Sequence, residues 1–180
     1  MAKVGILTIS DRASAGQYPD QSGPAIRELV VERLGAEVVE CAIVPDDADA
    51  IRTVLVTWTD VRQLDLILTT GGTGFAPRDI TPEVTRSIIQ REAPGLVFAM
   101  LRDGLQITPH AMLTRAVAGI RGRTLIVNLP GSPKAACQSL VSILPALPHA
   151  LAMLGNLSGA EADHDFKRPV AESDQQADEH

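Results

Sequence analysis

Three apolar runs of strand length constrain the fold most strongly, because a polar loop and a segment with helical spacing follow each of them. The runs are residues 3–9, 36–44 and 64–70, and the helical segments are residues 24–35, 48–61 and 81–93. Repetition of strand, loop and helix predicts parallel strands joined by right-handed crossovers. The sequence therefore indicates an α/β fold.

The second half of the chain adds a different pattern. Residues 114–131 have two apolar runs around a glycine-containing turn, which is typical of an antiparallel hairpin. Residues 95–106, 132–144 and 145–154 have helical spacing, and Ser132 and Pro133 are expected to begin the second of these helices. Since only 3% of the residues are aromatic, the core must consist of aliphatic side chains. We expect a mixed, mostly parallel sheet with helices packed on it.

Charge divides the chain into two parts. Residues 156–180 contain seven acids against Lys167 and Arg168, and they carry most of the formal charge of −6. They lack apolar periodicity, so we expect one domain over residues 1–155 and a disordered acidic tail over 156–180. The body is nearly neutral and has no basic stripe, which argues against nucleic-acid binding.

The N-terminal apolar run is too short for a signal peptide or a membrane span. Cys41 and Cys137 stand singly, as reduced thiols do. We therefore expect a cytoplasmic protein that does not associate with a membrane.

A glycine-rich loop follows the third apolar run. Gly71, Gly72, Thr73 and Gly74 can adopt positive φ angles and direct backbone N–H groups towards an anion, with phosphate as the expected ligand. An ordinary tight turn is the alternative interpretation. The chain has neither the dinucleotide pattern GxGxxG nor the Walker pattern ending in Lys-Ser/Thr, so neither NAD nor P-loop chemistry is indicated.

Two aspartates near the ends of neighbouring strands are not needed as helix caps. Thr81 is expected to cap the helix after the glycine loop, and Asp47 the helix before it, which leaves Asp79 and Asp46 for other roles. Two carboxylates on adjacent loops suggest a Mg²⁺ site, because this ion takes one or two carboxylates together with water and substrate phosphates. The histidines are not spaced as zinc ligands or as members of a catalytic triad.

Four segments resemble one known family closely. They are "SDRASAG" with "DQSGP", "VPDD", "TTGGTGFAPRDITPE" and "NLPGSPKAACQSLVSILPALPHAL", in the family's order and within about residues 4–154. The chain resembles the molybdopterin adenylyltransferases, which include separate bacterial proteins and the gephyrin-like domains of fusion proteins. The resemblance implies a three-layer α/β/α sandwich, commonly assembled as a homotrimer.

The resemblance also implies a reaction and its residues. The terminal phosphate of molybdopterin attacks the α-phosphorus of ATP in the presence of Mg²⁺, giving adenylylated molybdopterin and pyrophosphate. Asp46 and Asp79 match the family's catalytic aspartates and would also hold Mg²⁺. Expected binding residues are Ser10, Asp11, Arg12, Ser22, Thr70, Gly71, Gly72, Thr73, Gly74, Arg78, Asn128, Pro130, Gly131 and Ser132. For Glu92, Arg115 and Lys134, a binding role and a purely structural role are weighted equally.

Two alternatives remain from the sequence. A pterin-binding or carrier paralogue could keep the pocket without turnover, and the glycine block alone does not distinguish it from the enzyme. A molybdate-inserting domain also carries a similar glycine block, but such domains belong to longer chains. Molybdopterin synthase and a molybdate-insertion protein are the partners to be expected of the enzyme.

Overall fold

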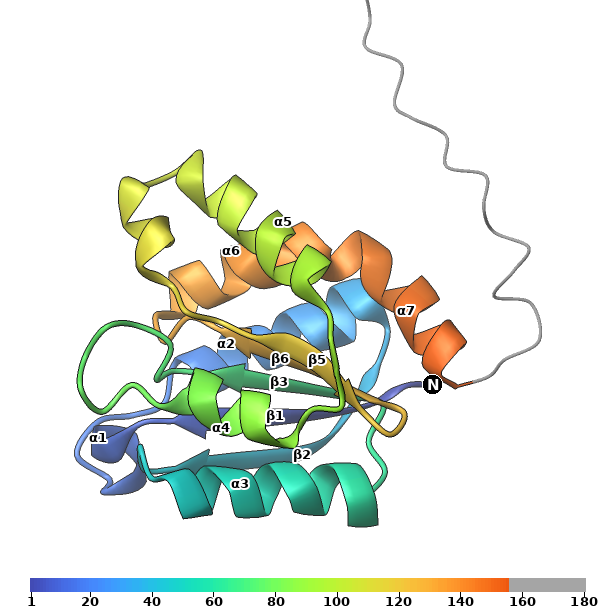
Figure 1. Ribbon diagram of the computed structural model, residues 1–180, viewed down its shortest axis with the longest axis horizontal. Coiled ribbons are helices and arrows are strands. Elements are labelled where there is room, and N and C mark those ends of the chain that lie inside the picture. The colour runs from blue at the N-terminus through green and yellow to red at the C-terminus, as the bar shows by residue number, and fades with distance from the viewer. Residues whose placement is uncertain (156–180) are drawn as a thin grey trace, which may run out of the picture.

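The computed structural model describes residues 1–155, which form a three-layer α/β/α sandwich (Figure 1). The expected tail, residues 156–180, lies outside the described residues. Six strands form one sheet in the order β2-β1-β3-β6-β5-β4. They are β1 (Lys3–Ile9), β2 (Glu37–Val44), β3 (Leu66–Thr70), β4 (Arg91–Glu92), β5 (Ala118–Arg121) and β6 (Thr124–Leu129). The strands β2, β1, β3 and β6 pair in parallel with their neighbours in this order. Strand β5 pairs antiparallel with β6, and β4 pairs antiparallel with β5, which confirms the mixed sheet.

Helices cover both faces of the sheet, and each face has its own hydrophobic core. One face carries α2 (Ser22–Leu29), α5 (Pro94–Leu105), α6 (Pro133–Ile143) and α7 (Leu147–Leu154). The other carries α3 (Ala48–Val56), which runs below the sheet in Figure 1, and α4 (Thr81–Ile88). Ile6 and Leu68 belong to the first core, and Leu7 and Ile67 to the second, as the alternation of side chains along a strand requires.

Shorter helical turns complete the part of the chain that the structure describes. They are α1 (Asp11–Ser14), the π-helical turns η1 (Val30–Leu34) and η2 (Thr57–Val61), and the 3₁₀ turns η3 (Pro109–Leu113) and η4 (Leu144–Ala146). The 3₁₀ turn η4 joins α6 to α7 and contains Pro145, because a proline inside a continuous α-helix would interrupt its hydrogen bonds.

The helices that follow neighbouring strands alternate between the two faces near the middle of the sheet. After β1 the chain enters α2 on one face, after β3 it enters α4 on the opposite face, and after β6 it returns to the first face in α6. Such a reversal opens a crevice at the carboxyl ends of the strands. Reversals occur on both sides of β3, between β1 and β3 and between β3 and β6, so the glycine loop after β3 lies between two such crevices.

Two sequence predictions about α4 were wrong. Thr81 does not cap the helix with its side chain, because its hydroxyl donates to Gly71 O at 2.9 Å instead. The helix ends at Ile88 rather than at residue 93, since the backbone of Ile89 is extended and β4 follows. The amides of Gln90 and Ala93 donate to Ile120 and Ala118, and the gain from this pairing outweighs helical propensity.

The C-terminal helical stretch is apolar for a structural reason. Pro133–Leu154 is long enough, and with a mean hydropathy of 1.4 apolar enough, to cross a membrane by composition alone. Ala136, Leu140, Ile143 and Leu147 within it are buried in the core of one face of the sheet. Packing in the sandwich therefore accounts for part of this apolar character, since 22% of the apolar window is buried.

Candidate active site

The glycine loop is built so that only glycine fits at its first positions. Gly71 and Gly72 have φ angles of 103° and 64°. A Cβ at Gly71 would lie 2.1 Å from Ile9 O, and one at Gly72 would lie 2.3 Å from Thr81 Oγ1. The loop is thus pressed against the end of β1 on one side and the start of α4 on the other.

Asp46 and Asp79 both face this loop and line one polar cavity of about 440 Å³. Asp46 Oδ2 accepts a hydrogen bond from Asp11 N at 3.0 Å, while Oδ1 faces Gly72, 3.1 Å from where its Cβ would be. Asp79 Oδ2 accepts from Ala76 N at 2.9 Å and also faces the loop, close to Gly74. The two carboxylates that the sequence singled out are thus brought together.

Burial raises the pKa of the Asp46 carboxyl above its ordinary value. The hydrogen bond from Asp11 N opposes this shift, but the negative charges of Asp11 and Asp79 add to it. A site that raises the free energy of a carboxylate in this way favours a compensating cation.

The polar cavity lies at the crevice between β1 and β3. Besides the two aspartates, eight residues expected from the sequence line it: Ser10, Asp11, Arg12, Ser22, Thr70, Gly71, Gly72 and Gly131. Several of these also hold the loops together. Ser10 caps α1 by accepting from Ala13 N at 3.2 Å, and Ser22 Oγ donates to Gly131 O at 2.8 Å.

Asp20 was missed in the sequence although it organises this wall of the cavity. Its carboxylate accepts from Thr8 Oγ1 and from the amides of Ser22 and Gly23, at 2.8–3.1 Å. Tyr18 was missed as well, and its ring lies 5.5 Å below the guanidinium of Arg12. The Asp-x-Ser-Gly spacing of residues 20–23 is a signal for such an aspartate turn.

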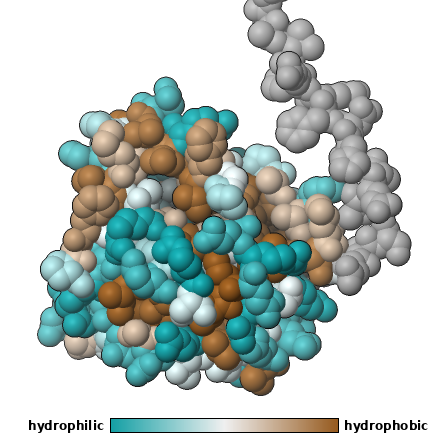
Figure 2. Space-filling model, in the orientation of Figure 1, coloured by the Kyte–Doolittle hydropathy of each residue, from teal (hydrophilic) through white to brown (hydrophobic). Residues whose placement is uncertain are grey.

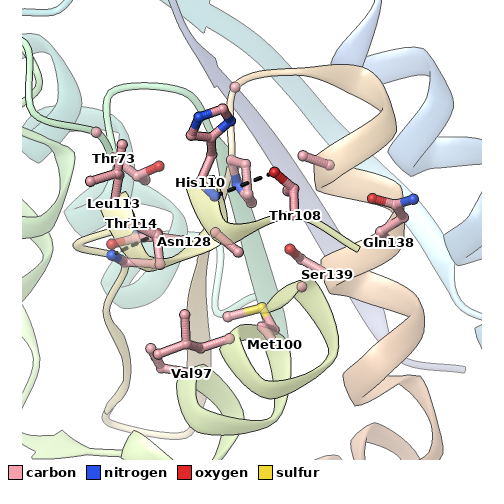
Figure 3. Close-up of a pocket in the computed structure, with 18 of the residues that line it drawn as sticks. Thr73, Val97, Met100, Thr108, His110, Leu113, Thr114, Asn128, Gln138 and Ser139 are labelled. Atoms are coloured by element: carbon pink, nitrogen blue, oxygen red, sulfur yellow. Dashed lines mark hydrogen bonds between the residues drawn. The ribbon is translucent and has the colours of Figure 1, made fainter. Parts of the chain in front are cut away.

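A second cavity of about 450 Å³ opens at the crevice between β3 and β6, and its wall is mostly apolar (Figure 3). Val97 and Met100 of α5, Leu113 of η3 and Ser139 of α6 contribute side chains to it. Thr73, Gly74, Asn128 and Pro130, expected as binding residues, also line it. Gly72, Asp79 and Gly131 border both cavities, so the two meet at the glycine loop.

Asn128 has a structural function in addition to its place at this wall. It is fully buried, and its Nδ2 donates to Thr69 Oγ1 and Thr85 Oγ1, both at 3.0 Å. Its Oδ1 accepts from Val117 N at 3.1 Å. These bonds join β3, α4 and the start of β5, and they use both amide hydrogens of Asn128.

Arg115 holds the far side of the glycine loop. Its guanidinium donates to the carbonyl oxygens of Gly74 and Asp79 and to the Glu83 carboxylate. Its own amide donates to Thr73 O at 2.8 Å. Of the three residues for which binding and structure were weighted equally, Arg115 therefore lies at the site.

Four other residues considered from the sequence are not among the residues that line either cavity. Glu92 faces Arg86 at 3.7 Å on the edge strand β4, and Lys134 is exposed in the first turn of α6. Ser132 caps α6 by accepting from Ala135 N at 3.1 Å, as predicted. Arg78 lies at the rim and is directed towards Asp11.

The donor set is suited to Mg²⁺ with a phosphorylated substrate rather than to a metal held by protein alone. Residues 1–155 contain no group of three or more His, Cys, Asp or Glu side chains that could hold a metal ion. Asp46 and Asp79 supply carboxylate oxygens, and Mg²⁺ commonly completes such a site with water and substrate phosphates.

Comparison with known proteins settles the family. The model of a family described as a probable molybdopterin binding domain matches residues 5–149. The chain belongs to this molybdopterin-binding domain family. Its members include the molybdopterin adenylyltransferase of Helicobacter pylori J99, 44% identical over 155 residues, which cover 85% of this chain and 88% of that protein.

Other members of the molybdopterin-binding domain family are much longer. Gephyrin of Dictyostelium discoideum is 46% identical over 162 residues, 85% of this chain, yet the match spans only 22% of gephyrin's length. Among solved structures, the molybdopterin biosynthesis enzyme MoaB of Thermus thermophilus has a TM-score of 0.83 at 52% identity, covering 87% of this chain and 98% of that one. The Mog protein of Mycobacterium ulcerans has a TM-score of 0.80 at 38% identity, covering 86% and 99%.

Proposed function

We propose that this protein is a molybdopterin adenylyltransferase, which transfers AMP from ATP to the terminal phosphate of molybdopterin. The observation that carries this proposal is the shared position of Asp46 and Asp79 in one polar cavity, beside a glycine loop that also borders an apolar cavity. A reaction between two phosphorylated substrates needs two compartments that meet where the phosphates react. The relatives named molybdopterin adenylyltransferase support the same assignment.

The transfer requires positioning and charge neutralisation more than proton removal. An oxygen of the terminal phosphate of molybdopterin forms a bond to the α-phosphorus, and the bond from that phosphorus to the bridging oxygen breaks. The electron pair leaves with pyrophosphate. Since the attacking phosphate is already ionised at neutral pH, no general base is needed.

The residues of the chain contribute in different ways to this transfer. The glycine loop allows close approach of phosphate oxygens to its backbone. Asp46 and Asp79 would hold Mg²⁺, which supplies positive charge at the phosphate oxygens when bound. The largely apolar wall of the second cavity would exclude water from one side of the reacting groups.

A carrier that binds molybdopterin without turnover is the second candidate. It is suggested by relatives with other names, gephyrin at 46% identity and the Drosophila protein cinnamon at 45%. The presence of both Asp46 and Asp79 favours the enzyme. Pyrophosphate release from ATP with Mg²⁺, measured with and without molybdopterin, separates the two: the enzyme releases it only with the pterin, and a carrier binds the pterin and releases none.

Assembly, location and partners are also proposals. Exposed apolar side chains gather over α5 and η3 (Figure 2), among them Phe98 and Met112, which are 67% and 59% exposed. Such a surface is consistent with subunit contacts in a homotrimer. We expect a cytoplasmic protein that receives molybdopterin from its synthase and passes the product to a molybdate-insertion protein. Light scattering that gave a monomer mass would contradict the trimer.

A further inference from the structure

Three loops at the polar cavity are joined by Asp11, Arg78 and Asp46. Arg78 donates from Nε and Nη2 to the two carboxylate oxygens of Asp11, and from Nη2 to Asp46 O at 3.1 Å. Asp11 and Asp46 exchange hydrogen bonds, each amide donating to the other's carboxylate at 3.0 Å. Asp11 follows β1, Arg78 follows β3 and Asp46 follows β2, so the contacts connect the carboxyl ends of three strands.

This arrangement restrains nearly every polar group of Asp46. Its amide donates to Asp11 Oδ1, its carbonyl accepts from Arg78, and its Oδ2 accepts from Asp11 N. The remaining oxygen, Oδ1, faces Gly72 and the cavity. The orientation of Asp46 is therefore determined by Asp11 and Arg78.

Arg78 also joins Asp46 to the loop that carries Asp79. It directly precedes Asp79, whose amide and carboxylate form a tight turn with Ala76 through bonds of 2.9 Å each. A guanidinium anchored on Asp11 and Asp46 O therefore places this turn relative to Asp46.

The charges of Asp11 and Arg78 also favour a role in positioning over a role in binding phosphate. Asp11 would be a third carboxylate at the cavity, and Arg78 pairs with it in the fork geometry that suits a carboxylate. The guanidinium is directed at protein acceptors, not at the glycine loop where phosphates are expected. A direct phosphate contact would require Arg78 to leave Asp11.

We propose that Asp11 and Arg78 are positioning residues, which fix the separation of the Asp46 and Asp79 carboxylates so that both can hold one divalent cation. Arg78 acts through Asp46 and Asp79 and does not bind phosphate. The cation part of this inference rests on the proposed function, whereas the restraint of the two loops does not.

The restraint is tested by amide hydrogen exchange measured residue by residue in metal-free protein, for Arg78→Gln and Asp11→Asn. Each variant should speed exchange at Asp46 N and at Ala76 N by about tenfold, because both loops lose a shared anchor. Arg121→Gln is the matched control, since Arg121 makes the same type of fork with Asp60, at 2.9 and 2.6 Å, and one bond to a carbonyl, Ile88 O at 3.0 Å. Unchanged exchange at both amides in Arg78→Gln would overturn the proposal.

The consequence for the cation is tested by titrating Mn²⁺ in the presence of α,β-methylene-ATP and following the free ion by electron paramagnetic resonance. Arg78→Gln and Asp11→Asn should each weaken Mn²⁺ binding about tenfold, and the double variant should be no weaker than either single, as residues acting as a unit are non-additive. The Mn²⁺ affinity of Arg78→Lys should lie between those of wild type and Arg78→Gln. The Mn²⁺ affinity of Arg121→Gln should match that of wild type. A phosphate ligand would behave differently: Arg78→Gln would weaken nucleotide binding without Mn²⁺, and Asp11→Asn would not.

The two proposals fail in distinguishable ways. If wild type binds no Mn²⁺ with the nucleotide analogue, the proposed metal-dependent transfer is contradicted, and hydrogen exchange still decides whether Asp11 and Arg78 restrain the loops. If exchange rises in the variants but Mn²⁺ binding does not change, the positioning role is overturned and the transferase proposal stands.

Discussion

Arg115 Nε donates to the carbonyl oxygen of Gly74 at 2.7 Å, and this contact is one of three by which a single guanidinium joins the loop carrying Asp79 to the first turn of α4. The other two go to Asp79 O and to Glu83. Because a guanidinium spans several acceptors in one plane and an ammonium does not, Arg115 cannot be replaced by lysine without loss.

We therefore predict that Arg115→Lys lowers kcat for pyrophosphate release by roughly tenfold to a hundredfold while KM for ATP changes little, since a displaced Asp79 harms the transfer more than binding. Arg123→Lys is the control, because Arg123 makes a single exposed pair with Asp65 at 2.9 Å. Steady-state kinetics of both variants provide the comparison. Wild-type kcat in Arg115→Lys would show that the loop does not need this anchor.

The glycine loop gives a prediction about stability. Gly71→Ala would place a methyl group 2.1 Å from Ile9 O at a φ of 103°, whereas Gly122→Ala meets nothing within 4 Å at a φ of 57°. We expect Gly71→Ala to lower the free energy of unfolding by at least ~3 kcal/mol, because strain and steric overlap add, and Gly122→Ala by ~1 kcal/mol. Urea unfolding of both proteins measures the difference. Equal losses would mean that the loop relaxes around the methyl group.

The raised pKa of Asp46 predicts that this residue costs stability at neutral pH. A carboxyl with a pKa that is higher in the folded than in the unfolded state stabilises the fold at low pH, and this contribution is lost as pH rises through the folded pKa. Asp46→Asn, which resembles the protonated form and keeps an acceptor for Asp11 N, should raise the thermal midpoint at pH 7 in buffer with EDTA. The difference in thermal midpoint between Asp46→Asn and wild type should vanish towards pH 3. A lower midpoint for the variant at pH 7 would contradict the assigned electrostatics.

Much of the fold could be read from the sequence because its signals are local. The predicted runs at residues 3–9 and 64–70 contain β1 and β3, and the hairpin predicted within residues 114–131 forms as β5 and β6. Asp47 and Ser132 cap their helices with their side chains. These outcomes depend on contacts within a few residues, which the sequence displays directly.

The predictions that were incomplete or wrong depend on distant partners. Thr81 has the side chain and the position of a cap, but its hydroxyl finds Gly71 O on the folded-back loop. Nothing near Arg78 in sequence indicates that its partner is Asp11, 67 residues earlier. The apolar cavity was not anticipated either, because α5, η3 and α6 create it only by packing together.

The measurement that tests the central claim most directly is pyrophosphate release from ATP and Mg²⁺ by the purified protein, with and without molybdopterin, compared with Asp46→Ala and Asp79→Ala. We predict release by wild type that requires molybdopterin, and a loss of at least about a hundredfold in each variant with folding retained, as expected when a group that holds charge at the reacting phosphates is removed. Wild-type release in both variants, or molybdopterin binding by wild type without any release, would contradict the account.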